Sequence, residues 1–286
     1  MRGPLAYIGG KALHIKRLMP LVPPHNIYVE VFGGGASLLF HKDPSLVEVL
    51  NDIDSSLVNF YRVLRDEDKC KELIRLLELT PYSREELYWT RMNCECDDDI
   101  EFARRWFLMQ RMSFGGNMES TGWKLARFHS SRGISSAVSY WLSSIELLPE
   151  VHERLKIVQI DNTDFARVIK GHDSEDTFFY LDPPYILSSG ANDLYRYSMD
   201  ANDHIRLVNL ILSCKGKFML SCYDNEIYDA LTYAGWECAD YVIGVNSSGG
   251  GNKLNTDGGK GKRIETVWLS PNCETLPELR RMGHLA

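Results

Sequence analysis

The chain has 286 residues, of which 44% are hydrophobic and 25% charged, as is typical of a soluble globular protein with an ordinary core. No apolar run reaches the roughly 18 residues of a membrane-spanning helix, and the first residues lack a signal-peptide hydrophobic region, so we expect a cytoplasmic protein. The net charge of −7 does not indicate a nucleic-acid-binding protein, so such a function would need local basic patches. The seven cysteines show no paired CxxC spacing, and we therefore expect reduced thiols and no metal site.

The first motif along the chain is a glycine turn in front of a predicted helix over residues 12–19. Gly9 and Gly10 free the backbone for a tight turn, and Lys11 then lies in or near the first helical turn, four residues after Tyr7. From these residues alone, a loop with a solvated lysine is the favoured interpretation.

A strand that runs into consecutive glycines comes next. The apolar residues around Glu30 and Phe32 predict the strand, residues 33–35 are all glycine, and a helix is predicted over residues 36–40. Such a turn lets the backbone approach a ligand at a helix N-terminus. The alternative is a glycine-rich connection in an ordinary βα unit.

A second strand, predicted over residues 46–50, ends in front of Asp52. In nucleotide-binding α/β units an acidic residue about 20 positions after the glycine turn accepts from ribose hydroxyls, and Asp52 has that position. Asp54 or Ser55 is predicted to cap the helix over residues 57–64, because Asp and Ser accept from the free amides of a first turn.

The pattern then becomes helical and remains so until residue 155. Helices are predicted over residues 69–79, 83–91 and 100–112, with an acidic, solvated loop at residues 94–99. We expect residues 67–154 to form an inserted domain, with residues 1–66 and 155–286 forming the other.

Basic and aromatic side chains alternate near the end of this insertion. Residues 111–132 hold Arg111, Asn117, Lys124 and Arg127 around a glycine turn. This mixture suits phosphate contacts together with base stacking or groove insertion. A surface hairpin with ordinary charges explains the composition equally well.

The strand pattern resumes over residues 155–160, followed by Asp164, which is a candidate helix cap. A run of four apolar or aromatic residues, 178–181, then predicts a strand that is buried on both faces. Pro183 and Pro184 lack the amide hydrogens that a strand needs, so we expect the strand to stop at Asp182. This places a carboxylate at the carboxyl end of a central strand, with the ring of Tyr185 beside it.

The last part of the chain predicts a helix over residues 204–212, a strand over 218–221 and a hairpin with arms at 236–245 and 264–269. Between the arms lies a glycine-rich run with Lys253, Lys260 and Lys262. Its basic residues suit contact with phosphate groups, and we expect the run to order when an anionic substrate binds, the alternative being an unstructured hairpin tip.

The sequence Asp182-Pro183-Pro184-Tyr185 after an aromatic strand resembles the catalytic motif of the methyltransferases that modify adenine N6 or cytosine N4. The order of the motifs also resembles that of the Dam-type adenine-N6 DNA methyltransferases, the alpha group of the D12 class. In that group a cofactor aromatic and lysine, a glycine turn, an acidic strand end and an inserted domain precede the catalytic motif. Val31 and Ala36 replace a proline and a glycine found in many members of the family.

The resemblance implies an α/β fold of the Rossmann-like S-adenosylmethionine-dependent methyltransferase type, with helices on both faces of a mixed seven-stranded sheet and an antiparallel final hairpin. The insertion would be a mostly helical target-recognition domain. The residues that match the family's catalytic motif are Asp182, Pro183 and Tyr185. The implied contacts to S-adenosylmethionine come from Tyr7, Lys11, Glu30, Phe32, Gly34, Asp52, Asp164 and Asp182.

The implied activity is site-specific transfer of a methyl group to N6 of an adenine that is flipped out of double-stranded DNA, without a metal or a membrane. Cytosine-N4 methylation and a catalytically silent DNA- or nucleotide-binding protein are the alternatives. A restriction endonuclease that acts on the same site is a further expected partner.

Overall fold

The computed structural model describes residues 1–5, 11, 14–114, 118, 122–186, 197–244 and 262–274. The chain divides into two compact units. Unit 1 comprises Met1–Ala12, Gly34–His41 and Asp54–Ile160, and unit 2 comprises Leu13–Gly33, Lys42–Ile53 and Asp161–Ala286.

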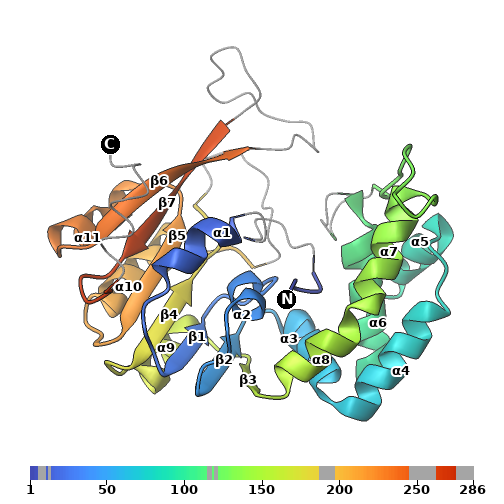
Figure 1. Ribbon diagram of the computed structural model, residues 1–286, viewed down its shortest axis with the longest axis horizontal. Helices are drawn as coiled ribbons and strands as arrows, with labels where there is room; N and C mark the ends of the chain where they lie inside the picture. The colour runs from blue at the N-terminus through green and yellow to red at the C-terminus, as the bar shows by residue number, and fades with distance from the viewer. Residues whose placement is uncertain are drawn as a thin grey trace. The chain divides into compact units, whose positions relative to one another are not determined.

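The strands form a seven-stranded sheet with the order β3-β2-β1-β4-β5-β7-β6 (Figure 1). The strands are β1 Ile27–Glu30, β2 Val47–Asn51, β3 Val158–Asp161, β4 Thr177–Leu181, β5 Lys217–Cys222, β6 Glu237–Gly244 and β7 Lys262–Leu269. β1 pairs in parallel with β2 and β4, and β4 with β5, whereas β7 is antiparallel to both β5 and β6. The predicted Rossmann-like sheet and its antiparallel final hairpin are confirmed.

Thirteen helical segments accompany the strands in the described residues. They are α1 Ile15–Leu18, η2 Met19–Leu21, α2 Ser37–His41, α3 Ser55–Arg65, α4 Glu67–Glu78, α5 Arg84–Met92, α6 Asp99–Met112, α7 Ser136–Glu146, α8 Leu148–Leu155, α9 Phe165–His172, α10 Ala201–Ile211, η4 Glu226–Tyr228 and α11 Asp229–Tyr233. The strand predicted from residue 155 begins only at Val158, because Leu155 packs as the last residue of α8.

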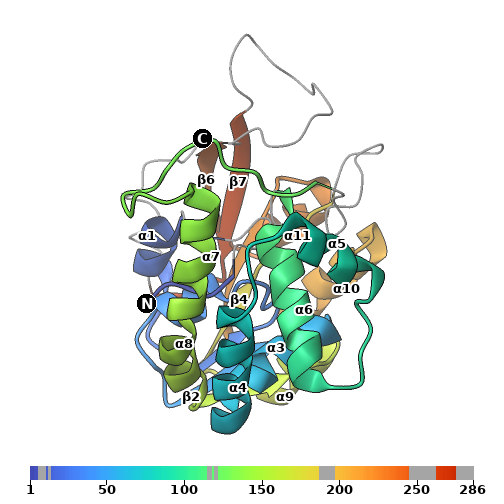
Figure 2. The same cartoon turned by 90° about the vertical axis from the view of Figure 1, so that its right-hand side faces the viewer.

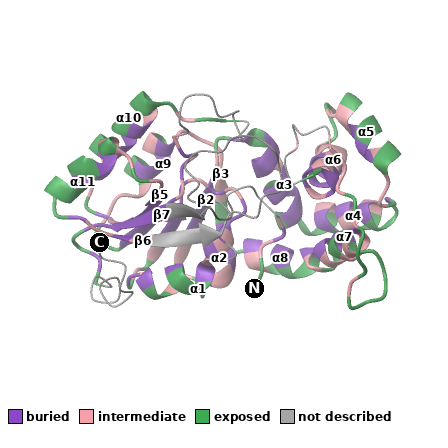
Figure 3. Ribbon diagram, turned by 90° about the horizontal axis from the view of Figure 1, so that it is seen from above, coloured by how far each residue is buried: buried purple, intermediate pink, exposed green. Residues whose placement is uncertain are grey.

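The core of unit 2 follows from alternation along the buried strands. Val29, Phe179 and Leu181 belong to one cluster with buried residues of α9 and α10, whereas Tyr28 and Phe178 alternate with them and contact each other and His25. Successive side chains of a strand point to opposite faces, so the aromatic run of β4 is buried on both. Figure 3 shows the matching pattern on α10, where buried and exposed residues alternate along the helix.

Unit 1 is mainly helical, with α3, α4, α5 and α7 packed on α6 (Figure 2). Phe60 of α3 stacks on Phe107 of α6, with ring centroids 5.2 Å apart, and Trp106 lies at the same distance from Phe60. The predicted cap is confirmed at Asp54, whose side chain accepts from the Ser56 amide at the start of α3. Residues 67–154 hold α4 to α7 and most of α8, while the domain boundaries at 66 and 155 remain a prediction.

Three further features concern the described part of the chain. No helix there is long and apolar enough to cross a membrane. No group of three or more His, Cys, Asp or Glu side chains within it is arranged to hold a metal ion. All seven cysteines lie in described residues, and none forms a disulfide.

A buried ion pair holds the segment between α2 and β2. Lys42 Nζ lies 2.6 Å from Glu48 Oε1, and both side chains are almost fully buried. The lysine also donates to Ser45 Oγ, which contacts His25 Nε2 at 2.9 Å. Each buried charge is therefore stabilised by an opposite charge that is itself held in place, and loss of either side chain removes this stabilisation from the other.

We expect Glu48→Gln to lower the free energy of unfolding by about 3–5 kcal/mol, the usual cost of breaking a buried ion pair from one side. Urea denaturation followed by circular dichroism measures this loss. The matched control is Glu67→Gln, which removes an exposed partner of Lys71 on α4 and should leave the urea midpoint unchanged. Equal midpoints for the two variants would show that the Lys42–Glu48 pair does not support the fold.

Candidate functional site

Polar side chains collect at the carboxyl ends of the parallel strands of unit 2. Glu30 is the last residue of β1, Asn51 is the last residue of β2 and precedes Asp52, and Asp182 directly follows β4. Because β1 is parallel to both neighbours, these ends meet at one edge of the sheet. Open α/β sheets bind their ligands at this edge.

Asn51 ties three loops together at this edge. Its amide nitrogen donates to the Val31 carbonyl at 2.9 Å and the Thr163 carbonyl at 3.1 Å, and its oxygen accepts from the Thr163 amide at 3.0 Å. Asn51 was not among the predicted site residues, whereas its neighbour Asp52 was predicted to accept from ribose hydroxyls. The available signal was an amide side chain at the buried end of an apolar strand, where it needs hydrogen-bond partners.

The glycine turn after β1 depends on close backbone contact. The Gly33 amide donates to the Asn51 carbonyl at 2.8 Å, and a Cβ atom at Gly33 would lie 2.8 Å from Leu50 Cδ1. Gly34 and Ala36 have left-handed φ angles of 46° and 48°. The family resemblance aligns Ala36 with a frequent glycine, and this backbone conformation explains why glycine suits the position.

Glu30 is an oriented acceptor at the end of β1. Its side chain is buried, with 2% exposure, and Oε2 accepts from the Tyr28 hydroxyl at 2.7 Å. Burial, reinforced by the Glu30 carboxylate, raises the pKa of Tyr28 well above its ordinary value, so the phenol keeps the hydrogen that it donates. Two residues further on, Phe32 is half-buried against the ring of Phe165.

Asp164 is the N-cap of α9. Its Oδ1 accepts from the Ala166 amide at 2.9 Å, and the Arg206 guanidinium donates to both carboxylate oxygens at 3.2 and 2.8 Å. The capping alternative raised by the sequence is therefore the observed local role of Asp164. A cofactor contact would have to share the carboxylate with Arg206.

The catalytic-motif residues form a rigid elbow after β4. The strand ends at Leu181 as predicted, and Asp182 is half-buried beyond it. The elbow is fixed by His204 of α10, whose Nε2 lies 3.1 Å from the Pro184 carbonyl oxygen and whose Nδ1 lies 2.7 Å from the Tyr228 hydroxyl.

His204 acts here as a neutral hydrogen-bonding group. Burial lowers its pKa, which favours the uncharged imidazole. A carbonyl oxygen can only accept, so Nε2 carries the hydrogen and Nδ1 accepts from Tyr228. From the sequence, His204 was predicted only as a helical residue. Its contact with the Pro184 carbonyl was not predicted, because the two residues are 20 positions apart.

Tyr185 is almost completely buried, with 8% exposure, and its hydroxyl meets two carboxylates. It lies 3.0 Å from Asp182 Oδ1 and also donates to Glu265 Oε1 of β7, while its ring centroid is 4.4 Å from that of Tyr223. Burial first, and then the charges of Asp182 and Glu265, raise the pKa of Tyr185 well above its ordinary value. The phenol is therefore a donor, and Glu265 and Tyr223 join the site without having been predicted.

The candidate DNA-binding residues of the insertion differ in exposure. Arg111 is half-buried, donates to the Pro4 carbonyl and lies over the ring of Phe107, and burial lowers its pKa to about 10. Lys124 is half-buried over Tyr140, and burial lowers its pKa. Arg127 is exposed.

Two further predicted site residues, Lys11 and Lys262, lie in the described part of the chain. Lys11 is buried in unit 1, and Lys262 is the first residue of β7. Four others lie outside the described residues, namely Tyr7, Asn117, Lys253 and Lys260.

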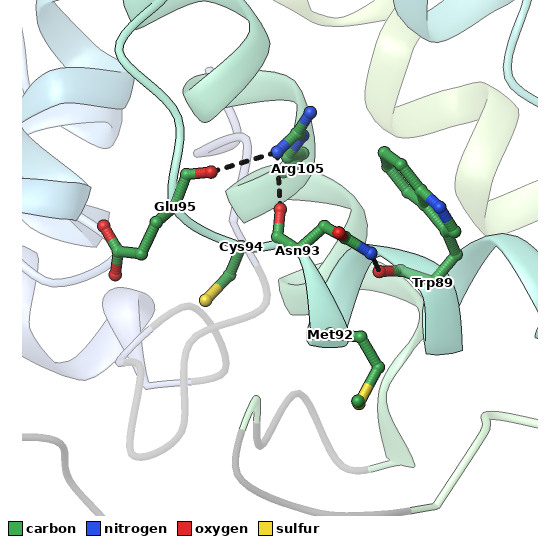
Figure 4. Close-up of a pocket in the computed structure, with 6 residues that line it drawn as sticks. All are labelled: Trp89, Met92, Asn93, Cys94, Glu95 and Arg105. Atoms are coloured by element: carbon green, nitrogen blue, oxygen red, sulfur yellow. Dashed lines mark hydrogen bonds between the residues drawn. The ribbon is translucent and has the colours of Figure 1, made fainter.

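A pocket of about 350 Å³ lies at the end of α5, lined by Trp89, Met92, Asn93, Cys94, Glu95 and Arg105 (Figure 4). The guanidinium of Arg105 donates to the carbonyls of Asn93 and Glu95, and lies 5.1 Å from the Trp89 ring centroid. It also pairs with Glu101. These contacts fold the predicted acidic loop around the arginine, so the pocket's cationic group already has protein partners.

Comparison with known proteins agrees with the geometry of the strand ends. The family model of the D12 class N6 adenine-specific DNA methyltransferases matches residues 7–237. Type II methyltransferase M1.LlaDCHI from Lactococcus lactis subsp. cremoris is 30% identical over 237 residues, which cover 75% of this chain and 78% of the relative. Modification methylase StsI from Streptococcus sanguinis is 21% identical over 225 residues, covering 74% of this chain and 33% of that protein.

The family match extends over the glycine turn, the acidic strand ends, the helical insertion and the elbow after β4. Methyltransferases of this family use S-adenosylmethionine as the methyl donor. The chain belongs to the D12 class of N6 adenine-specific DNA methyltransferases.

Proposed function

We propose that the protein is a site-specific DNA methyltransferase that moves the methyl group of S-adenosylmethionine to N6 of an adenine flipped out of the duplex. The observation that carries this proposal is the motif Asp182 to Tyr185 on a fixed elbow at the carboxyl end of the buried strand β4. The family match supports the choice of adenine.

The acceptors at the carboxyl edge suit the methyl donor, which has ribose hydroxyls, an amino group and a positively charged sulfur. Glu30, Asp52 and Asp182 contribute carboxylates there, and the tight Gly33 turn permits close backbone approach. The donor supplies a methyl group that its sulfonium charge has already made electrophilic. We assign binding of the methyl donor to eight residues, namely Tyr7, Lys11, Glu30, Phe32, Gly34, Asp52, Asp164 and Asp182.

The role of Asp182 follows from the chemistry of the adenine amine. The nitrogen lone pair is delocalised into the ring, so the amine is a poor nucleophile. A carboxylate oxygen of Asp182 and the carbonyl of Pro183 accept its two hydrogens, which favours a pyramidal nitrogen and directs the lone pair toward the methyl group. The nitrogen is strongly acidic after methylation, so the proton leaves without a permanent base.

The role of Tyr185 is to stack on the extrahelical base. The target atom is inaccessible inside a duplex, so the base must leave the helix before the reaction. The Tyr185 ring already packs against Tyr223, with the two rings tilted by 59° and their centroids 4.4 Å apart. The sequence after Tyr185, residues 187–196, lies outside the described part of the chain.

Target recognition is assigned to the insertion over residues 67–154. The exposed Arg127 and its neighbour Phe128, which is 81% exposed, offer a cation and an aromatic ring on adjacent positions. We assign DNA contacts to Arg111, Asn117, Lys124, Arg127, Lys253, Lys260 and Lys262.

A restriction endonuclease that cuts the same DNA site is the partner that we infer. The relatives named type II methyltransferase and modification methylase support this inference. In a bacterial host, methylation of genomic DNA would place the protein in the cytoplasm.

We expect Asp182→Ala to reduce the methyl transfer rate by about a hundredfold or more, the scale of a lost transition-state contact, with an unchanged fold. Single-turnover assays with a radiolabelled methyl donor measure the rate, and chromatography of the digested DNA identifies N6-methyladenine. Asp43→Ala, in an exposed loop of the same unit, is the matched control and should react like the wild type. Normal turnover by the Asp182 variant would refute the catalytic role, and N4-methylcytosine as product would refute the choice of base.

Arg127→Ala and Arg111→Ala should have different effects. Loss of the exposed Arg127 should flatten the dependence of log Kd on log salt by about 0.9 per phosphate contact, with unchanged thermal stability. Loss of Arg111 should also destabilise the protein by about 1.5–3 kcal/mol, because its guanidinium donates to the Pro4 carbonyl. Salt titrations by fluorescence anisotropy and thermal melts test both, and a wild-type slope for the Arg127 variant would contradict its contact with DNA.

A further inference from the structure

Glu265 is a buried carboxylate that belongs to none of the family motifs recognised in the sequence. The Glu265 side chain is 1% exposed, and it lies in β7, where the nearby residues Val267 to Leu269 are also buried and are apolar. A buried carboxylate is costly unless it is hydrogen-bonded. The Tyr185 hydroxyl, which donates to Glu265 Oε1, stabilises this charge.

The sheet topology explains how Glu265 reaches the catalytic motif. β7 is antiparallel to β5, and Thr266 pairs with Cys222, the last residue of β5. Glu265 therefore lies one residue beyond the carboxyl end of β5, which is parallel to β4. An antiparallel strand thus brings a carboxylate from 80 residues further along the chain to the edge that carries Asp182.

The Tyr185 hydroxyl has one hydrogen and two carboxylate neighbours. It lies 3.0 Å from Asp182 Oδ1 and within hydrogen-bond distance of Glu265 Oε1. A phenol donates one hydrogen, so donation to Asp182 and donation to Glu265 compete. The choice matters because a lone pair of Asp182 that accepts from Tyr185 is not available to the adenine amine.

We propose that Glu265 is a positioning residue that takes the phenolic hydrogen of Tyr185. It thereby fixes the ring for the base and keeps that hydrogen away from Asp182, whose carboxylate accepts from the amine. This inference rests on the proposed function. Glu265 influences the reaction through its hydrogen bond with Tyr185. Without Glu265, the phenol donates its hydrogen to Asp182 instead, and the ring is no longer held toward β7.

A double-mutant cycle tests this role. Glu265→Met removes the acceptor with little change in length, Glu265→Gln keeps an acceptor oxygen, and Tyr185→Phe removes the hydroxyl but keeps the ring. The measurements are the single-turnover methyl transfer rate at saturating donor and DNA, the Kd values of both, and the melting temperature.

We expect E265M to slow methyl transfer about tenfold to a hundredfold, the range of a small misplacement of reacting groups, with each Kd changed less than about threefold. E265Q should keep most of the wild-type rate. In the Y185F background E265M should cause no further loss, since the interaction that it removes is already absent. Glu274→Met, in the exposed segment after β7, is the control and should leave the rate unchanged.

Losses that multiply in the double variant would overturn the proposal, because Glu265 would then act independently of Tyr185. The proposal would also be overturned if E265Q were as slow as E265M, or if E265M changed only a Kd or the melting temperature and not the methyl transfer rate. Should E265M fail to fold, Glu265→Asp, which withdraws the carboxylate by one methylene, replaces it with the same expected coupling. A wild type that makes no N6-methyladenine refutes the proposed function instead, whereas multiplying losses in an active enzyme refute only the role of Glu265.

Discussion

The site depends on one constraint, the abrupt end of a strand that is buried on both faces. β4 pairs with β1 up to Tyr180 and with β5 up to Leu181, and two prolines then prevent any further ladder hydrogen bonds. The chain must leave the sheet at Asp182, so the carboxylate stays at the edge where the parallel strands end. The hydrogen bond between His204 and the Pro184 carbonyl fixes the direction in which it leaves.

The electrostatics of this edge separate groups that stay neutral from groups that carry charge. Burial raises the pKa of Tyr28 and Tyr185 and lowers that of His204, which favours the uncharged form of each, and each of these groups then carries a hydrogen to donate. Carboxylates lie at the strand ends, and in the proposed function they accept from the sugar hydroxyls of the methyl donor and attract its cationic sulfur. The same excess of acidic groups repels DNA phosphates, which explains why contacts to DNA must come from local basic residues in a chain of net charge −7.

The sequence predicted the features that local physics determines. Proline chemistry identified the end of β4, cap preferences identified Asp54, and apolar runs identified the strands of the sheet. Several boundaries were displaced by one to three residues. The strand predicted from residue 155 begins at Val158, because Leu155 fits the apolar pattern of a strand and of a helix equally well. Only packing in α8 decides between the two.

The overlooked residues are those whose partners lie far away in the sequence. Asn51 bonds to Thr163 across 112 residues, and Glu265 bonds to Tyr185 across 80. A glutamate in an apolar strand does signal a buried partner, but no local pattern says which side chain that partner is. The strand order places β7 beside β5, and this contact became visible only once the order was known.

The most direct test is a crystal structure of the enzyme with S-adenosylhomocysteine and DNA that contains the target site. The account predicts a flipped adenine on the ring of Tyr185, with a carboxylate oxygen of Asp182 about 2.6–3.2 Å from N6 and N6 facing the sulfur. An Asp182 carboxylate that points away from N6 and lies remote from the sulfur would contradict it.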